Sequence, residues 1–405
     1  MSIDRHKLYR FPWSKADNPG AWVEVTDDCN LYCPGCFRHK IEGHRPLEEV
    51  EADILACQEK LNCDRIAVSG GEPLLYPQII EVVEFIARHR MKPMLLTNGD
   101  LLTKSLALEL KKAGLAQFYF HVDSGQNRPG WEGKTEADLN ELRQYFADLV
   151  WETGGIQCGY NTTVFRTTLP QIPAIMEWGR KNIRKVHHIS FITFRGLITN
   201  GSVQYTAGNK TVDLSHFENT CPDLSQIDIS TEEIFDVLEA RFPGVRPCAY
   251  LNGTAALDSF KFLILINIGS EKKIFGGAGA RTIELVQVFY HLFKGRYCAF
   301  LTNPSPGKKI FILAFFDKAL RRAFKEFLNS AVKNPLRLFD RIYVQCINLQ
   351  QPHEIQDGEM NLCDGCVNLM IYKGKLINSC RLDEYRIFGG PLTPHKGNEQ
   401  MIRPN

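Results

Sequence analysis

The sequence has no marked excess of charge of either sign and no long hydrophobic run. Its 48 Lys and Arg residues nearly balance 46 Asp and Glu residues, for a formal net charge of +2, so composition gives no reason to expect a nucleic-acid partner. Apolar runs such as Phe262–Ile268 are far too short to cross a bilayer. The segment from Met1 to Lys7 lacks the apolar core of a secretory signal. These absences predict a cytoplasmic protein.

Cysteine, by contrast, is abundant. In a reducing compartment the 13 cysteines are not expected to form a disulfide framework. Metal binding or redox chemistry is therefore the leading explanation for the cysteines that cluster in the sequence. The scattered ones are expected to pack in the core, because cysteine is among the most buried residue types. These are Cys57, Cys63, Cys158, Cys221 and Cys298.

Short apolar runs alternate with helical patterns between residues 21 and 195. The expected strands are Trp22–Val25, Arg65–Ser69, Pro93–Thr97, Gln117–Val122, Ile156–Val164 and His188–Phe194. Five helical patterns lie between them, the first starting at Pro46 and the third ending at Gly114. Repeated βα units predict an α/β fold, here a partial (β/α)6 barrel with a parallel sheet. Functional groups then gather at the carboxyl ends of the strands.

The remaining chain divides by composition. We expect a short N-terminal extension over 1–20, the barrel with a polar linker or lid over 21–228, and a mixed, mainly helical insert over 229–345. A small cysteine-rich region follows over 346–388, and 389–405 is expected to be a loose tail.

The first cysteine group is Cys29, Cys33 and Cys36, with the spacing C-x3-C-x2-C. It directly follows the first expected strand, where a βα barrel places chemistry. A structural zinc site or a closed [4Fe–4S] cluster needs four ligands, whereas three cysteines leave one iron open for reaction. The alternative is a zinc knuckle completed by His39 or His44.

This triad resembles the signature of the radical S-adenosylmethionine (radical SAM) superfamily. A second similarity is Gly70-Gly71-Glu72-Pro73, directly after the second expected strand. The resemblance implies a [4Fe–4S] cluster on the triad, with SAM held by the Gly70–Pro73 segment. It further implies reductive cleavage of SAM to a 5′-deoxyadenosyl radical that abstracts hydrogen from a substrate. A reductant such as flavodoxin or ferredoxin would supply the electron.

Polar residues at later strand ends would complete the SAM pocket if the resemblance holds. They are Asn98, Asp123, Ser124 and Asn161. Each alone is equally well explained as a turn residue or a buried polar group.

The second cysteine group is Cys346, Cys363, Cys366 and Cys380. Cys363 and Cys366 form a C-x2-C knuckle, and a hairpin-like pattern then leads to Cys380. Four cysteines satisfy either zinc or a closed iron–sulfur cluster. The group resembles the auxiliary-cluster regions called SPASM and twitch domains, which implies an auxiliary [4Fe–4S] cluster. Cys346 could be replaced as a ligand by Cys248.

The layout as a whole resembles the branch of the superfamily that includes archaeal tetraether synthase. That resemblance implies a lipid alkyl chain as substrate, with carbon–carbon bond formation or a related modification. The pattern over 310–332 supports this hypothesis, because a basic amphipathic helix can lie on a membrane surface. A core-facing helix with a solvated face explains the same pattern. Two alternatives are a peptide-modifying SPASM-type maturase and a non-catalytic iron–sulfur protein.

Overall fold

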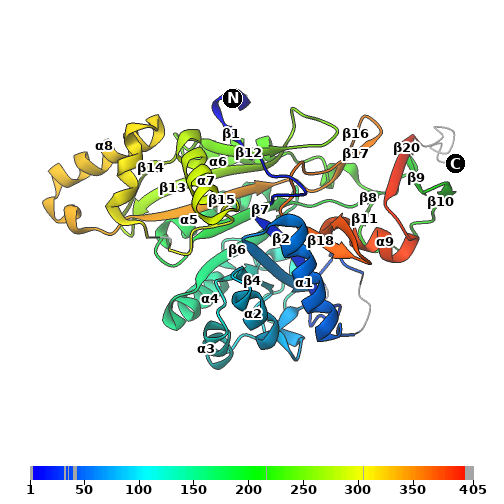
Figure 1. The fold of residues 1–405 in the computed structure, drawn as a ribbon. Helices are drawn as coiled ribbons and strands as arrows, with labels where there is room; N and C mark the ends of the chain where they lie inside the picture. Colours follow the sequence, from blue (N-terminus) through cyan, green and yellow to red (C-terminus); the bar gives the residue numbers. More distant parts are fainter. Residues whose placement is uncertain are drawn as a thin grey trace.

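A computed structural model describes residues 3–31, 33, 34, 36–39, 43–215, 217–303 and 305–396. Its centre is an 11-stranded sheet (Figure 1). Six neighbouring parallel strands form the first part of this sheet. They are β2 (Gly20–Thr26), β3 (Arg65–Gly70), β4 (Lys92–Thr97), β5 (Gln117–His121), β6 (Gln157–Val164) and β7 (His188–Thr193).

Five helices connect these strands, as the sequence predicts. They are α1 (Leu47–Leu61), α2 (Ile79–Arg88), α3 (Lys104–Lys112), α4 (Asn140–Thr153) and α5 (Ile172–Lys181). Figure 1 shows α1 to α4 together on one side of the sheet. The apolar stripe of α1, including Val50, Ile54 and Cys57, is buried in the main core. The predicted α/β barrel class is therefore confirmed, and all five scattered cysteines are buried.

The region 229–345 contributes strands to the same sheet as well as helices. Next to β7 lies β15 (Tyr343–Gln350), parallel to it, with Cys346 opposite His188. The sheet continues through β13 (Phe260–Ser270), β12 (Pro247–Asn252) and β1 (Tyr9–Arg10), while β14 (Lys273–Gly277) pairs with the far end of β13. The helices of this region are α6 (Thr231–Arg241), α7 (Ala280–Lys294) and α8 (Lys318–Lys333). The expected mainly helical insert is thus partly a continuation of the barrel sheet.

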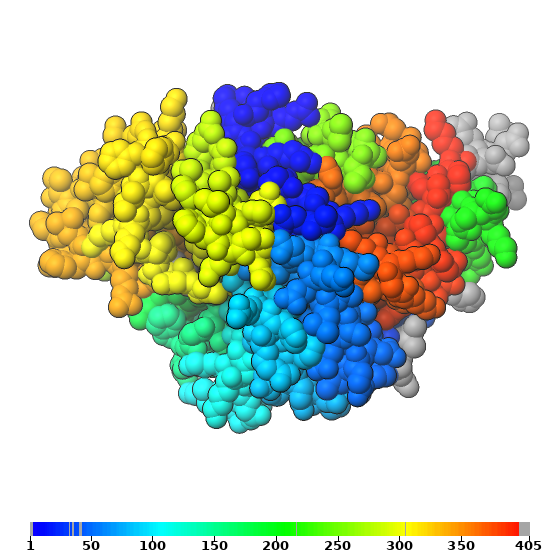
Figure 2. All heavy atoms as spheres, viewed as in Figure 1, coloured from blue at the N-terminus to red at the C-terminus, as the bar shows by residue number. Residues whose placement is uncertain are grey.

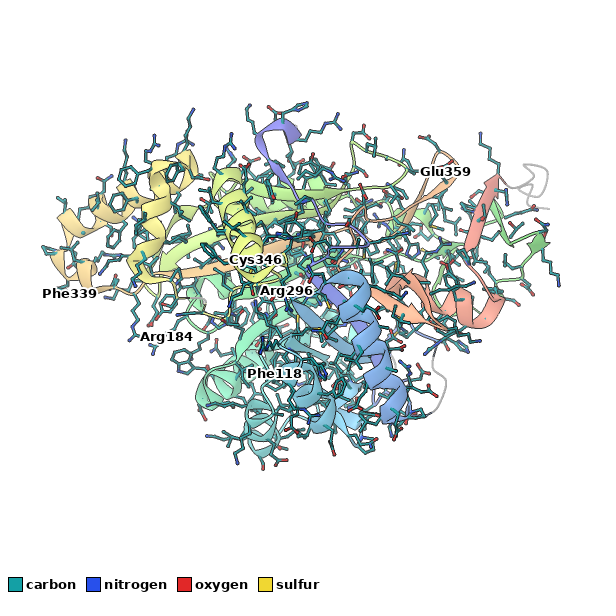
Figure 3. The ribbon with its side chains drawn as sticks, viewed as in Figure 1. Phe118, Arg184, Arg296, Phe339, Cys346 and Glu359 are labelled. Carbon is teal, nitrogen blue, oxygen red and sulfur yellow. The ribbon has the colours of Figure 1, made fainter. Side chains whose placement is uncertain are left out.

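Part of this region projects from the sheet as a lobe, which is built from β14, η6 (Gly307–Phe315), α8 and η7 (Pro335–Phe339). Figure 3 shows Phe339 at one end of the molecule, far from Cys346 near its middle. The apolar side of α8, with Leu320 and Phe327, is buried in the core of the lobe. Of the two explanations for the 310–332 pattern, the structure supports the core-facing helix.

Short elements surround the carboxyl ends of the barrel strands. The expected linker holds β8 (Leu197–Ile198), β9 (Val203–Ala207), β10 (Lys210–Thr211), β11 (Thr220–Cys221) and η5 (Leu224–Gln226). The C-terminal region holds β16 (Glu354–Gln356), β17 (Glu359–Asn361), the hairpin β18 (Leu369–Tyr372) and β19 (Lys375–Asn378), η8 (Ser379–Arg381), α9 (Leu382–Phe388) and β20 (Leu392–Lys396). Further 3-10 turns are η1 (Arg5–Lys7), η2 (Pro73–Leu75), η3 (Ser124–Gln126) and η4 (Leu169–Gln171).

The expected loose tail begins as an ordered strand. β20 pairs with β9 along its whole length, and Leu392 is buried, so backbone pairing and apolar burial hold this part of the tail in place. The rest of the expected tail, 397–405, lies outside the described residues. Among the helices that the structure describes, none is long and apolar enough to cross a membrane.

Candidate active site

A cavity of about 400 Å³ opens at the carboxyl ends of the barrel strands and extends down into the barrel. The triad Cys29, Cys33 and Cys36 lines it together with Gly70, Gly71 and Glu72. Two sequence segments more than thirty residues apart in the chain therefore meet at one site. This is the juxtaposition that the order of βα units predicts.

The triad loop follows β2 directly. An isolated bridge between Thr26 and His44 joins the two ends of the loop. All three thiols are partly exposed and form no disulfide, and the Cys36 N–H donates to the Cys33 carbonyl over 3.2 Å. Within the described residues, no three His, Cys, Asp or Glu side chains converge on a point for a single metal ion. A [4Fe–4S] cluster binds each cysteine through a separate iron, so it needs three thiols at one cavity, and Cys29, Cys33 and Cys36 line the same cavity.

The Gly70–Gly71 pair lets two loops approach each other closely. A Cβ at Gly71 would lie 2.1 Å from the Asp28 carbonyl oxygen, and one at Gly70 would lie 2.1 Å from the Thr26 carbonyl oxygen. The Gly71 N–H donates to Thr26 over 2.8 Å and the Glu72 N–H to Asp28 over 2.7 Å. The resemblance to radical SAM enzymes implies that this segment holds SAM. In the structure, the backbone that these glycines admit is that of the triad loop.

Glu72 links the end of β3 to the end of β4. Its carboxylate accepts from the Leu74 N–H (2.9 Å), the Thr97 hydroxyl (2.6 Å) and the Asn98 N–H (2.7 Å). Burial raises the pKa of Glu72 to about 7, against these hydrogen bonds. Pro73 starts η2 and is buried. The Gly-Gly-Glu-Pro segment is thus a rigid bridge between the triad loop and the next strand end.

Three of the four other predicted SAM-facing residues line the cavity: Asn98, Asp123 and Asn161. The Asn98 side chain donates to Asn30 over 2.7 Å, in the triad loop. Burial acts to raise the pKa of Asp123, but the nearby His121 and hydrogen bonds from His121 and Thr163 outweigh it and lower the pKa. The Asn161 Oδ1 is buried without a hydrogen-bond partner, which is the state expected of a group that meets a ligand.

Ser124 lies differently from the prediction. It begins η3, and its N–H donates to Glu136 over 2.7 Å. Its neighbours Asp123 and Gly125 line the cavity, but Ser124 does not.

One wall of the cavity was not found from the sequence. Four buried residues there carry side-chain atoms without a hydrogen-bond partner among the described residues. They are Thr193, Arg195, Asn219 and His353, and all four line the cavity. The unpaired atoms are the Thr193 hydroxyl, Arg195 Nε, Asn219 Oδ1 and both ring nitrogens of His353. Because buried polar groups are normally paired, this wall is suited to the polar part of a ligand.

Charges of both signs surround this wall, because Arg195 and Lys261 lie near Glu354 and Arg381 pairs with Glu384. Burial lowers the pKa of His353 to about 3, and Arg381, Lys261 and Arg195 lower it further. Burial also lowers the pKa of Arg195, to about 10. No motif marks the four wall residues in the sequence, because they come from three separate segments.

Replacing His353 with leucine is expected to reduce the loss of stability in acid. The folded protein keeps this imidazole neutral down to about pH 3, whereas the unfolded chain protonates it below about pH 6.5. The wild-type free energy of unfolding therefore loses about 1.4 kcal/mol per pH unit as pH falls from 6.5 towards 3. Urea unfolding at pH 6.5 and at pH 5 measures this loss. Between these two pH values, the free energy of unfolding of H353L should fall by about 2 kcal/mol less than that of wild type. The exposed control H6L should follow wild type, and an H353L profile parallel to wild type would contradict this account.

The second cysteine group is only partly brought together. Cys363 and Cys366 share a hydrogen bond that raises the pKa of the Cys363 thiol and lowers that of Cys366. Burial raises the pKa of the Cys380 thiol to about 12, and the nearby Cys366 contributes to this increase. Cys346 lies apart, on β15 inside the barrel, and its electrostatic neighbours include Tyr119 and Cys248.

Comparison with known proteins agrees with the barrel motifs. Residues 23–177 match the family described as the radical SAM superfamily. A probable GTP 3′,8-cyclase of Methanocaldococcus jannaschii is 35% identical over 105 residues, which cover 25% of this chain and 35% of that protein. The AdoMet-dependent heme synthase of Methanosarcina barkeri is 28% identical over 192 residues, 44% of this chain and 51% of that protein. The chain thus spans about half or less of these relatives.

Solved structures give a weaker likeness. Streptococcus suis SuiB, bound to precursor peptide SuiA, aligns with a TM-score of 0.40 and 15% identity over 56% of this chain and 45% of that chain. The protein anSMEcpe, with bound AdoMet and a peptide, aligns with a TM-score of 0.39 and 18% identity over 55% of this chain and 58% of that one. The family match over residues 23–177 and the curated relatives, which are named as enzymes, support the same assignment. This part of the chain is similar to the radical SAM superfamily, whose members use a [4Fe–4S] cluster and SAM.

Proposed function

We propose that the protein is a radical SAM enzyme that abstracts hydrogen from a substrate held in the barrel cavity. Cys29, Cys33 and Cys36 would hold the catalytic cluster. When bound, the reduced cluster and SAM together supply a 5′-deoxyadenosyl radical, which removes a hydrogen atom from an unactivated carbon. A flavodoxin or ferredoxin is the proposed reductant. The observation that carries the proposal is the meeting of the cysteine triad and the Gly70–Pro73 segment in one cavity.

The chain's own residues position the reactants and exclude water. Glu72 fixes the loop geometry through its three hydrogen bonds, and Asn161 offers an unpaired oxygen to SAM. The aromatic side chains of Trp22, Phe262 and Phe300 line the cavity and keep water from its interior. Ser124 is not expected to contact SAM directly, given its place behind the cavity wall.

Two substrate classes are proposed. A lipid alkyl chain fits the apolar part of the lining, and a polar head would meet the wall at Arg195 and His353. A peptide is the alternative, since its apolar side chains and its polar backbone would also divide between the apolar and polar parts of the lining. Cys363, Cys366 and Cys380 are proposed ligands of an auxiliary cluster. Cys346 remains a weaker candidate, because its position on β15 separates it from the other three.

Anaerobic reconstitution with iron and sulfide, followed by incubation with SAM and dithionite, tests the reaction class. We expect 5′-deoxyadenosine and methionine, measured by chromatography and mass spectrometry, and none without reductant. No 5′-deoxyadenosine from protein with a full iron content would favour a non-catalytic iron–sulfur protein. The substrate class is tested by adding lipid extract or peptide from the source cells and following the increase in 5′-deoxyadenosine and the mass change of each addition.

A further inference from the structure

Helix α7 turns its polar side inward and its apolar side outward. On the inner side, Gln287 exchanges hydrogen bonds with the Cys298 backbone (2.9 and 3.1 Å), and the Tyr290 hydroxyl donates to Asp64 over 2.8 Å. The outer side, called here the α7 face, consists of Val288, Phe289, Leu292 and Phe293, all exposed. Leu292 is 71% exposed and Phe293 77%. A surface helix of a globular protein normally has the reverse orientation.

The neighbouring lobe also presents large apolar side chains. Its exposed set, called the lobe face, lies on η6, the end of α8, and η7. The set is Ile312, Phe315, Phe316, Val332, Leu336 and Phe339. Phe315 is 80% exposed and Phe339 82%. The lobe has its own apolar core, so these residues are additional to those that hold it together.

The segments that carry the two faces are joined, because the Gly279 and Thr282 N–H groups at the start of α7 donate to Asp317, which caps α8. Figure 2 shows the residues from α7 to η7, coloured yellow to orange, side by side over one end of the visible face. The turn between β13 and β14 lies at the amino ends of β7 and β15, because Gly269 pairs with Tyr343 at the start of β15. This surface is therefore at the end of the barrel opposite the triad. Apolar surface on this scale marks an interaction site.

The same segment has a net positive charge, whereas the rest of the chain is net negative. Residues 280–342 contain 12 Lys and Arg against 4 Asp and Glu, whereas the rest of the chain has 36 against 42. Three of these 12 residues, Lys318, Arg322 and Lys325, lie exposed on the outer side of α8. Exposed Phe and Leu side chains beside many cations are the composition that binds the interface of an anionic bilayer.

We propose that the α7 face and the lobe face dock the protein on the surface of an anionic lipid membrane. The apolar side chains enter the boundary between headgroups and acyl chains, and the surrounding lysines and arginines contact lipid phosphates. A second copy of the chain is disfavoured as occupant, because two such surfaces would bring like charges together. The docking does not depend on the proposed reaction, since it uses no residue of the cavity.

Vesicle co-sedimentation of the full chain tests the docking. We expect binding to vesicles of equal phosphatidylglycerol and phosphatidylcholine, and at least about tenfold weaker binding to phosphatidylcholine alone or in 0.5 M NaCl. The variants L292S/F293S on α7 and F315S/F316S on the lobe should each weaken binding at least about tenfold. The variant K318Q/R322Q/K325Q should weaken it similarly and reduce its dependence on salt.

The matched control is L257S, which removes a leucine that is 67% exposed but lies outside both faces. It should bind as wild type, and thermal unfolding should show that every variant is folded. Wild type that does not bind anionic vesicles would overturn the proposal, as would L292S/F293S or F315S/F316S binding normally. A dimer in light scattering that these variants convert to monomer, without vesicle binding, would assign the surface to a second copy instead.

Discussion

Replacing Cys33 with alanine is expected to reduce 5′-deoxyadenosine formation by at least about a thousandfold, the scale seen when an essential reactive group is lost. The three thiols of the triad line the cavity beside Glu72 and Asn98, and two thiolates cannot hold a cluster that needs three protein ligands. Cleavage of SAM should therefore stop even though the cavity keeps its shape. The measurement is the 5′-deoxyadenosine yield of anaerobically reconstituted protein, with iron content determined on the same samples.

Two matched variants separate the triad from the other cysteines. C366A should lower the iron content through loss of the proposed auxiliary cluster, yet leave 5′-deoxyadenosine formation without substrate within a few fold of wild type. C57A removes a thiol that is buried on α1 and should change neither quantity. Equal loss of cleavage in C33A and C366A would contradict the assignment of the catalytic cluster to the triad.

The barrel could be predicted from the sequence because each of its units is local. Every strand from β2 to β6 is followed by a helix whose apolar spacing and end signals can be seen within about thirty residues. The Gly70–Pro73 segment and the triad could be placed together for the same reason, since parallel neighbours bring their carboxyl ends to one edge. The positions of Asn161 and Asp123 near this edge follow from the same alternation of strands and helices.

The remainder depends on contacts between distant segments. β15 joins β7 across about 150 residues of chain, and no local pattern signals that partner. Sequence proximity suggested Cys346 as a ligand beside Cys363, yet a strand carries it into the barrel. The wall at Arg195 and His353 is missed because its residues come from separate loops. The sequence also does not predict that the apolar side of α7 faces outward. Periodicity shows that a helix is amphipathic but not which of its sides faces the protein.

Arg38 is the second residue whose loss should have a large effect. Its guanidinium pairs with Glu24 on β2, and its Nη2 donates to the Ser379 carbonyl over 2.7 Å. Both partners of the ion pair are buried, with side-chain exposures of 4% and 1%. Ser379 directly precedes Cys380 and Arg38 follows Cys36 by two residues, so this side chain joins the triad loop directly to the second cysteine group.

The variant R38M is expected to lower the free energy of unfolding by about 3–5 kcal/mol, because it leaves the Glu24 carboxylate buried and unpaired. Urea unfolding of the unreconstituted protein measures this loss. The control R246M removes an arginine that is 53% exposed and pairs with Glu239 at the surface, where an ion pair contributes about 0–1 kcal/mol. A loss in R38M no larger than in R246M would show that the buried pair does not stabilise the fold.

The double variant E24L/R38M separates stability from positioning. Replacing both charges with apolar side chains removes the unpaired carboxylate, so part of the stability should return, although the Trp22 indole N–H loses its acceptor and Asp383 loses a nearby cation. The hydrogen bond to Ser379 stays absent, so the triad loop keeps only its other links to the C-terminal region, among them His39 N–H to Asp383 and Arg386 to Asp27. If Arg38 positions the two cysteine groups, the double variant should be more stable than R38M but retain less iron than wild type after desalting. Recovery of both stability and iron retention would limit Arg38 to neutralising Glu24.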